Sequence, residues 1–172
     1  NVFGQTETCG TVTVTEPCES AKVLAESVGR PLPGAEMRIA DAAGNPVPIG
    51  TSGEIQIRGP YCMTGYLNRP DATAEAFTAD GFLRTGDLGI ERPDGNFSYV
   101  GRLKEMFKSG GYNIYPVEIE LALGEHPAVS AAAVLPVSHP MFQEVGHAFI
   151  QTSDPALDAE TLRAFLKPLL AN

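Results

Sequence analysis

The pattern of the sequence changes at Gly101, and this change sets the limits on the fold. Before it, short apolar segments alternate with turns that contain Gly, Pro or Asp. Examples are the strand predicted at Met37–Ile39, the turn at Asp41–Pro46 and the strand at Gly53–Arg58. After Gly101, predicted helices and strands alternate. The sequence therefore predicts an α+β fold in two parts, of which the first is rich in β-strands.

One helix and one hairpin complete the expected elements of the first part. Pro70–Phe77 is predicted to be a short helix, because Pro is tolerated in a first turn and acidic residues lie near the start. Pro93-Asp94-Gly95 predicts a turn, because Pro fixes φ and Gly permits a positive φ. The strands expected on either side, Leu88–Arg92 and Asn96–Val100, should pair as a hairpin.

Beyond Gly101 a Gly-rich loop is followed by the elements of a small α+β domain. We expect a helix at about Pro116–Glu125, strands at Val129–Leu135 and His147–Thr152, and a helix at about Asp158–Leu170. The boundary between the two parts is predicted between residues 102 and 105.

The charge balance excludes some classes of partner. The 172 residues are 43% apolar, which is enough to bury a core. A net charge of −9, from 12 Lys and Arg against 21 Asp and Glu, leaves no basic surface for nucleic acid or anionic lipid. A phosphate-bearing ligand would therefore depend on a few placed Arg, Lys and backbone N–H groups.

The cysteines and histidines suggest no metal site. Three cysteines at wide spacings, with no Cys-x-x-Cys pair, fit reduced thiols in a cytoplasmic protein better than zinc ligands or disulfides. No apolar segment is long enough to span a bilayer. We assign no role to the histidines, since a lone His is more often structural than catalytic. The residues concerned are Cys9, Cys18 and Cys62, and His126, His139 and His147.

Four segments occur in order along most of the chain: Phe3–Glu7, Gly53–Gly59 with Thr64–Leu67, Arg84–Leu88, and Gly101–Glu120. Together they resemble the adenylate-forming superfamily, which includes acyl- and aryl-CoA synthetases, luciferases and the adenylation domains of peptide synthetases. The last segment is specific by itself, and the order and spacing of all four make a coincidence improbable.

The first segment carries the roles that the resemblance implies for the adenine and the metal. Phe3 would pack against adenine with Gly4 beside it, Thr6 would face the phosphate or the acyl carboxylate, and Glu7 would help to hold Mg²⁺. A carboxylate is a hard oxygen ligand that suits Mg²⁺, and an aromatic face suits a base. A turn in which Gly4 permits an unusual φ, while Thr6 and Glu7 cap a following helix, is the structural alternative.

Asp87 and Arg102 are the other nucleotide-binding residues that the resemblance implies. A carboxylate that follows a Thr-Gly turn can accept hydrogen bonds from both ribose hydroxyls. Arg102 would reach the ribose and phosphate region with a guanidinium that is always charged. The alternative is a surface Asp–Arg pair, which would contribute little to stability.

The resemblance assigns the residues after Arg102 to movement and to CoA. Lys104 falls at the hinge position between the large and small domains of the family, and no Pro lies between Gly95 and Tyr115. Ser109, Gly110 and Gly111 would bring backbone N–H groups close to the pantetheine of CoA, since Gly has no Cβ. An ordinary Gly turn between strands is the alternative for this loop.

The activity implied by the resemblance is that of an acyl-CoA synthetase, as used in fatty acid metabolism. It would convert a carboxylic acid, ATP and CoA into acyl-CoA, AMP and pyrophosphate through an acyl-adenylate, with Mg²⁺. Residues 1–102 would be the end of the large AMP-binding domain, and residues 103–172 most of the small mobile domain. Transfer to a carrier protein, or a non-catalytic interaction module of the same fold, are the alternatives.

The ends of the sequence suggest a piece of a longer protein. The chain begins without Met inside a motif, and it contains no Ser/Thr/Gly-rich phosphate loop of the family type. Lys167 is the only lysine beyond Lys108, and it does not stand in the Gly-Lys setting of the family's adenylation lysine. The sequence therefore predicts that this chain is inactive by itself.

Overall fold

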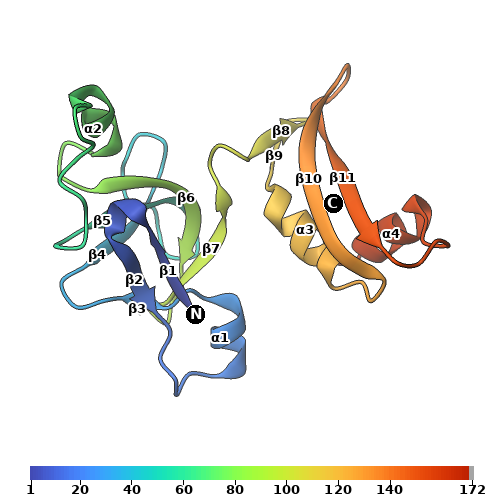
Figure 1. Ribbon diagram of the computed structural model, residues 1–172, viewed down its shortest axis with the longest axis horizontal. Coiled ribbons are helices and arrows are strands. Elements are labelled where there is room, and N and C mark those ends of the chain that lie inside the picture. The colour runs from blue at the N-terminus through green and yellow to red at the C-terminus, as the bar shows by residue number, and fades with distance from the viewer. Residues whose placement is uncertain (171–172) are drawn as a thin grey trace. The chain divides into compact units, whose positions relative to one another are not determined.

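A computed structural model describes residues 1–170 of the chain, and these residues form two compact units. The first unit is Asn1–Leu103, and the second begins at Lys104. Sheets and helices occur in both units, which confirms the α+β fold (Figure 1). Each unit is described by itself below.

The first unit contains two antiparallel sheets, one with the order β1-β2-β3 and one with the order β4-β5-β6-β7 (Figure 1). Two short helices, α1 and α2, and a 3₁₀ turn, η1, connect the strands. The elements are β1 (Val2–Gln5), η1 (Thr6–Thr8), β2 (Gly10–Val14), α1 (Ala21–Glu26), β3 (Arg30–Pro31), β4 (Glu36–Ala40), β5 (Ser52–Arg58), α2 (Pro70–Ala76), β6 (Leu83–Glu91) and β7 (Phe97–Arg102).

The core of this unit lies around β5. Ile55 and Ile57 are buried and pack with Val12 of β2, Ile39 of β4 and Phe97 of β7. Gln56, between the two isoleucines, is also fully buried, so both faces of β5 are covered. The Gln56 amide accepts a hydrogen bond from Arg38 Nε and donates one to Glu54, which compensates for its burial.

The second unit is a sheet with the order β10-β11-β8-β9 and two helices (Figure 1). Leu123 of α3 and Leu162 of α4 pack with Val129 and Val134 of β10, so both helices bury their apolar sides against the long β10–β11 hairpin. The elements are β8 (Phe107–Ser109), β9 (Tyr112–Ile114), α3 (Pro116–Gly124), β10 (Val129–His139), β11 (Gln143–Thr152) and α4 (Ala159–Leu166).

Local signals explain most of the helix starts. Pro70 and Pro116 stand at the first positions of α2 and α3, where a missing N–H costs no helical hydrogen bond. Asp158 caps α4 by accepting a hydrogen bond from the Thr161 N–H at 2.8 Å. These are the three helices that the sequence predicts, and all three are present.

Several predicted boundaries are wrong. The helix expected to reach Leu170 ends at Leu166, because Pro168 has no N–H for the helical ladder and its ring collides with the preceding turn. The strand expected from Leu88 begins at Leu83, and the pair expected at Val129–Leu135 and His147–Thr152 is longer at its turn end. The Gly-rich loop is a hairpin between β8 and β9.

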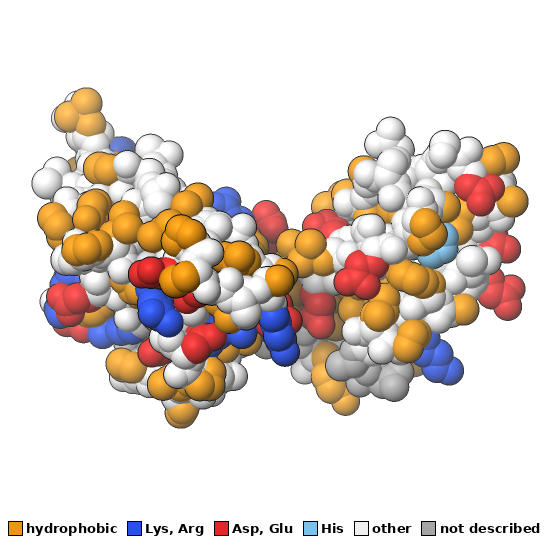
Figure 2. Space-filling model, turned by 90° about the horizontal axis from the view of Figure 1, so that it is seen from below, with side chains coloured by type: hydrophobic (Ala, Val, Ile, Leu, Met, Phe, Trp, Pro, Cys, Tyr) orange, Lys and Arg blue, Asp and Glu red, His pale blue; other side chains and the backbone are white. Residues whose placement is uncertain are grey.

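On the face seen in Figure 2, Lys and Arg side chains of the first unit are interspersed with Asp and Glu, whereas the charged side chains of the second unit are mostly Asp and Glu. Within residues 1–170, no helix has the length and apolarity needed to cross a membrane.

Candidate functional site

Phe3 lies in β1 beside the end strand of the neighbouring sheet. Its N–H donates to Thr13 Oγ1 at 3.1 Å, which fixes the backbone, and its ring is half-buried. The ring centroid lies 6.5 Å from that of Tyr99 on β7, with 34° between the planes. The structure thus places two aromatic faces together where sequence analysis named only Phe3.

Gly4 is required for a close approach of two strands. A Cβ at this position would lie 1.9 Å from the carbonyl oxygen of Gly10 on β2. The left-handed residue in this segment is Cys9, with φ of 55°, and Gly4 itself has no positive φ. The structural alternative based on an unusual φ at Gly4 is therefore wrong.

Thr6 and Glu7 lie in η1, whose backbone is fixed by a buried side chain. The Thr8 hydroxyl accepts from the Gln5 N–H at 2.9 Å and donates to the Gly10 carbonyl at 2.7 Å. Thr6 is exposed and Glu7 half-buried. These residues cap no α-helix, because the chain passes directly from η1 into β2.

Glu7 contacts a loop that is far away in the sequence. The Tyr66 hydroxyl donates to Glu7 Oε1 at 2.9 Å, and the Met63 N–H donates to the Glu7 carbonyl at 2.7 Å. The hydrogen bond to the carboxylate raises the pKa of Tyr66, since the protonated phenol is the donor. Tyr66 is the second residue of this site that sequence analysis missed, although it lies within the quoted segment Thr64–Leu67.

The Glu7 carboxylate suits a metal ion whose other ligands do not come from the residues around Glu7. Residues 1–170 contain no cluster of three or more His, Cys, Asp or Glu that could hold a metal ion. One carboxylate oxygen of Glu7 accepts from Tyr66, and the structure shows no hydrogen bond to the other oxygen within this range. A single hard oxygen ligand fits Mg²⁺ that is also bound by phosphate oxygens and water.

Asp87 and Arg102 form a cross-strand pair at the ends of β6 and β7. The two residues are partners in the antiparallel register, and Arg102 Nε donates to Asp87 Oδ1 at 3.0 Å. Asp87 is only 4% exposed, whereas 54% of the Arg102 side chain is accessible. The pair exists, but its carboxylate is buried, unlike the surface pair of the alternative interpretation.

The turn that carries Asp87 is held by Glu54, the third residue that sequence analysis missed. Glu54 Oε1 accepts from the Gly86 N–H at 3.2 Å, and Glu54 Oε2 accepts from Arg84 Nη1 at 3.3 Å. Gly86 has a φ of 71°, and its carbonyl accepts from the Leu103 N–H at 2.8 Å. The signal was present in the sequence, because Glu54 lies in the segment Gly53–Gly59.

The second unit presents the other expected residues on a hairpin turn. Gly110 and Gly111 have φ of 56° and 90°, as in a two-residue type I′ turn between β8 and β9. Ser109 pairs with Tyr112 across the turn and with Gln143 of β11. The alternative of a Gly turn between strands is thus what the backbone forms, and a role toward CoA stays a prediction.

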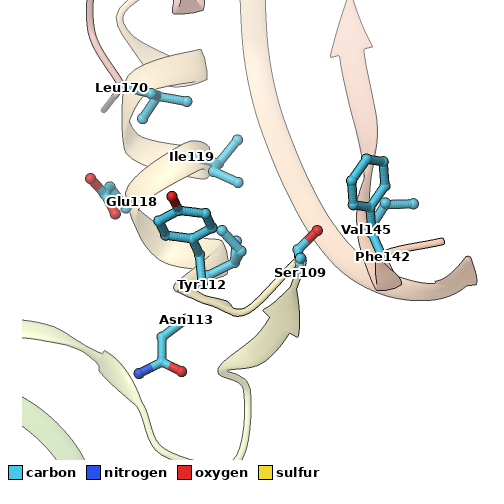
Figure 3. A pocket seen from close by; sticks show the side chains of 10 residues that line it. Ser109, Tyr112, Asn113, Glu118, Ile119, Phe142, Val145 and Leu170 are labelled. Atoms are coloured by element: carbon cyan, nitrogen blue, oxygen red, sulfur yellow. The ribbon is translucent and has the colours of Figure 1, made fainter. Parts of the chain in front are cut away.

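A cavity of about 530 Å³ lies beside this turn, between α3 and β11 (Figure 3). Ile119, Phe142 and Val145 give it an apolar lining, and Ser109 and Glu118 add polar groups. A second hollow of about 590 Å³ in this unit is lined by Lys104 among others. Phe3, Thr6, Glu7, Asp87 and Arg102 belong to the first unit, and Lys104 and the glycine turn belong to the second.

Comparison with known proteins gives consistent results. The family model described as "AMP-binding enzyme" matches residues 1–67. Feruloyl-CoA synthase from Amycolatopsis sp is 41% identical over 170 residues, which cover 98% of this chain and 34% of that protein. The chain spans about a third of the length of the curated relatives that it matches.

Several solved structures are similar over 99% of this chain, two of them being a CoA synthetase and an amide bond synthetase. The o-succinylbenzoate CoA synthetase from Bacillus subtilis, in complex with its acyl-adenylate intermediate, has a TM-score of 0.92 at 35% identity, and the match covers 34% of that chain. The amide bond synthetase from Marinactinospora thermotolerans has a TM-score of 0.89 at 36% identity, and the match covers 35% of that chain.

Proposed function

Since the chain belongs to the adenylate-forming superfamily of AMP-binding enzymes, we propose that it is part of an ATP-dependent acyl-CoA synthetase. The longer protein that would contain it is called the complete protein below. In the proposed reaction, a carboxylate oxygen attacks the α-phosphorus of ATP and pyrophosphate leaves. The sulfur of CoA then attacks the acyl carbon, AMP leaves, and the thiol proton is released.

The proposal depends on one observation, the burial of the Asp87 carboxylate and its hydrogen bond to Arg102. A carboxylate that is 4% exposed loses most of its hydration and requires hydrogen-bond donors. Arg102 supplies one donor at 3.0 Å, and Glu54 fixes the turn before Asp87 through Gly86. We propose that the hydroxyls of the ATP ribose donate to Asp87 as well, with Arg102 between the ribose and the phosphates.

The remaining residues of the first unit would bind the rest of the nucleotide. We propose that adenine packs against Phe3, whose ring already lies beside Tyr99. Thr6 would face the α-phosphate or the acyl carboxylate. Glu7 would be a ligand of Mg²⁺, which when bound supplies positive charge against the phosphate oxygens.

The second unit would contribute to thioester formation. We propose that Lys104, the first residue of this unit, is the hinge about which the small domain turns between the two steps. Ser109, Gly110 and Gly111 would then line the path of the CoA thiol, because the absence of side chains on the glycines lets a ligand approach the backbone. We place the enzyme in the cytoplasm, where its three free cysteines would stay reduced.

A specific alternative exists for one part of the proposal, which is the molecule that accepts the acyl group. The amide bond synthetase with a TM-score of 0.89 is similar over 99% of this chain. An acceptor other than CoA, either an amine or the thiol of a carrier protein, is therefore the second candidate. A module without catalytic activity is the third, and it would leave the buried Asp87 without a role in ligand binding.

A direct assay separates these candidates. The complete protein is incubated with ATP, Mg²⁺ and a panel of carboxylic acids, and then with CoA, a phosphopantetheinylated carrier protein or an amine in parallel. We expect acid-dependent pyrophosphate release and acyl-CoA formation, and neither product from the 172-residue chain alone. Product with an amine or a carrier protein in place of CoA would change the acceptor, and absence of pyrophosphate release with every acid would favour the non-catalytic module.

A further inference from the structure

The loop Met63–Leu67 has no role in the proposed reaction, yet it makes two hydrogen bonds to Glu7. The Tyr66 hydroxyl donates to the Glu7 carboxylate at 2.9 Å. The Met63 N–H donates to the Glu7 carbonyl at 2.7 Å. One loop therefore holds both the backbone and the side chain of a residue 59 positions earlier in the chain.

Tyr66 is itself fixed from behind by the first turn of α2. Its N–H donates to Thr73 Oγ1 at 2.9 Å, and that hydroxyl donates to the Arg69 carbonyl at 2.9 Å. Gly65 has a φ of 151°, and a Cβ there would lie 2.7 Å from Thr73 Cγ2. The backbone that presents Tyr66 is thus packed too closely to admit a side chain at the preceding position.

The energy of this contact is too small for it to serve folding. Tyr66 is 41% exposed and Glu7 is half-buried, so water competes for both partners. Hydrogen bonds and charge contacts at such positions add little to stability. What the contact does is restrict rotation of the carboxylate, because one oxygen is tied to the phenol while the other stays available.

We propose that Tyr66 is a positioning residue that orients the Glu7 carboxylate toward the metal–ATP complex, an inference that rests on the proposed function of Glu7. The phenol donates to Oε1, which would leave Oε2 to hold the cation. Phosphate oxygens and water would supply the other ligands. Without the phenol, Glu7 samples several rotamers, and part of the metal affinity is lost in restricting it again.

Tyr66→Phe in the complete protein tests this proposal, because it removes only the hydroxyl. The first readout is the affinity for Mn²⁺·ATP without the acid, measured by water-proton relaxation. We expect it to fall about fivefold, as for the loss of a hydrogen bond of ordinary net strength. The second readout is acid-dependent pyrophosphate exchange, in which we expect the KM for Mg²⁺ to rise by about the same factor while kcat stays within about twofold of wild type.

Tyr61→Phe is the matched control. Its hydroxyl donates to the Pro33 carbonyl at 3.0 Å within the same unit, and not to Glu7. We expect both readouts of this variant to equal those of wild type. An equal loss in Tyr61→Phe would show that any tyrosine hydroxyl of the unit acts through folding, and this would overturn the proposal.

Glu7→Gln distinguishes a failure of this inference from a failure of the proposed function. We expect it to weaken Mn²⁺·ATP binding more than Tyr66→Phe does. If Glu7→Gln weakens binding and Tyr66→Phe does not, the inference about Tyr66 is wrong and the role of Glu7 stands. If Glu7→Gln binds Mn²⁺·ATP like wild type, the role of Glu7 is wrong, and the inference fails with it.

Discussion

The two units of this protein are stabilised in different ways. The first unit contains several side-chain ion pairs, among them Arg38–Asp80, Arg92–Glu26 and Arg102–Asp87. The described part of the second unit relies on an apolar core that includes Leu123 and Leu162. Charged hydrogen bonds fix directions, whereas apolar packing does not. The first unit is thus suited to hold a charged ligand in one geometry.

The largest expected effect tests whether the second unit moves. Lys104→Pro fixes φ near −65° and removes an N–H, so one conformation is trapped. In the complete protein we expect acyl-CoA formation to fall about a hundredfold or more, while acid-dependent pyrophosphate exchange is kept. The two half-reactions are measured separately on one preparation.

Lys104→Ala is the control for this variant, because it removes the charge and leaves the backbone free. We expect it to keep both half-reactions. An equal loss of both in Lys104→Pro would indicate misfolding, and full retention of both would show that the chain does not bend at residue 104.

The next effect tests how much the apolar core stabilises the second unit. Leu123 is 1% exposed, and Leu123→Ala is expected to destabilise the unit by about 2–5 kcal/mol. Amide hydrogen exchange, resolved by residue, should show faster exchange in β10 and β11 and no change in β4–β7. Leu121→Ala on the same helix, where the side chain is 69% exposed, should have almost no effect. Equal acceleration in both units would mean that they unfold as one.

A smaller effect is expected from the Asp87–Arg102 pair of the first unit, in which only the carboxylate is buried. Asp87→Ala removes the proposed acceptor of the ribose hydroxyls, so kcat/KM for ATP should fall roughly tenfold in the complete protein. Asp71→Ala is the matched control, because Asp71 pairs with Arg69 at 3.2 Å and both side chains are exposed. If both variants keep wild-type ATP kinetics, Asp87 has a structural role only.

The smallest effect concerns the pH dependence of the first unit. Hydrogen bonds from Arg38 and Thr78 lower the pKa of Asp80 to about 2, so the folded state favours the ionised carboxylate. The ionised carboxylate therefore stabilises the folded state fully above the ordinary pKa of 3.8, and this stabilisation is lost as the pH falls toward 2. Asp80→Asn should therefore lower the thermal midpoint of the chain at pH 6 and have less effect at pH 2.5. The same difference at both pH values would contradict this assignment.

Sequence reasoning succeeded where one local signal decides the structure. Pro at an early helical position predicted α2, and the Pro93–Gly95 turn predicted the β6–β7 hairpin. The strands β1, β2 and β3 were not predicted, because their pairing depends on contacts between distant segments. The close approach of Gly4 to Gly10 is one such contact, which no periodicity reveals.

In the candidate site, too, local segments were recognised, whereas the contacts between distant segments were not. The quoted segments contained Glu54 and Tyr66, but their partners Gly86 and Glu7 lie 32 and 59 residues away. The resemblance supplied roles for Phe3, Glu7 and Asp87, and only the structure shows that Tyr99 lies beside Phe3. Contacts of this kind arise from tertiary packing, so they could not be predicted from single segments of the sequence.

The pairing of Asp87 with Arg102 depends on the register of β6 and β7, and therefore on the number of residues in each strand. Asp87 faces Arg102 because a fixed number of residues separates them, with one irregularity already present at Leu88–Gly89. An insertion of one residue within either strand would turn Arg102 to the opposite face of the sheet. An insertion in the exposed Pro93–Gly95 turn would be absorbed by the loop. Natural variation in chain length should therefore concentrate at this tip, so that homologues differ there in size while the distance between the two charged groups stays constant.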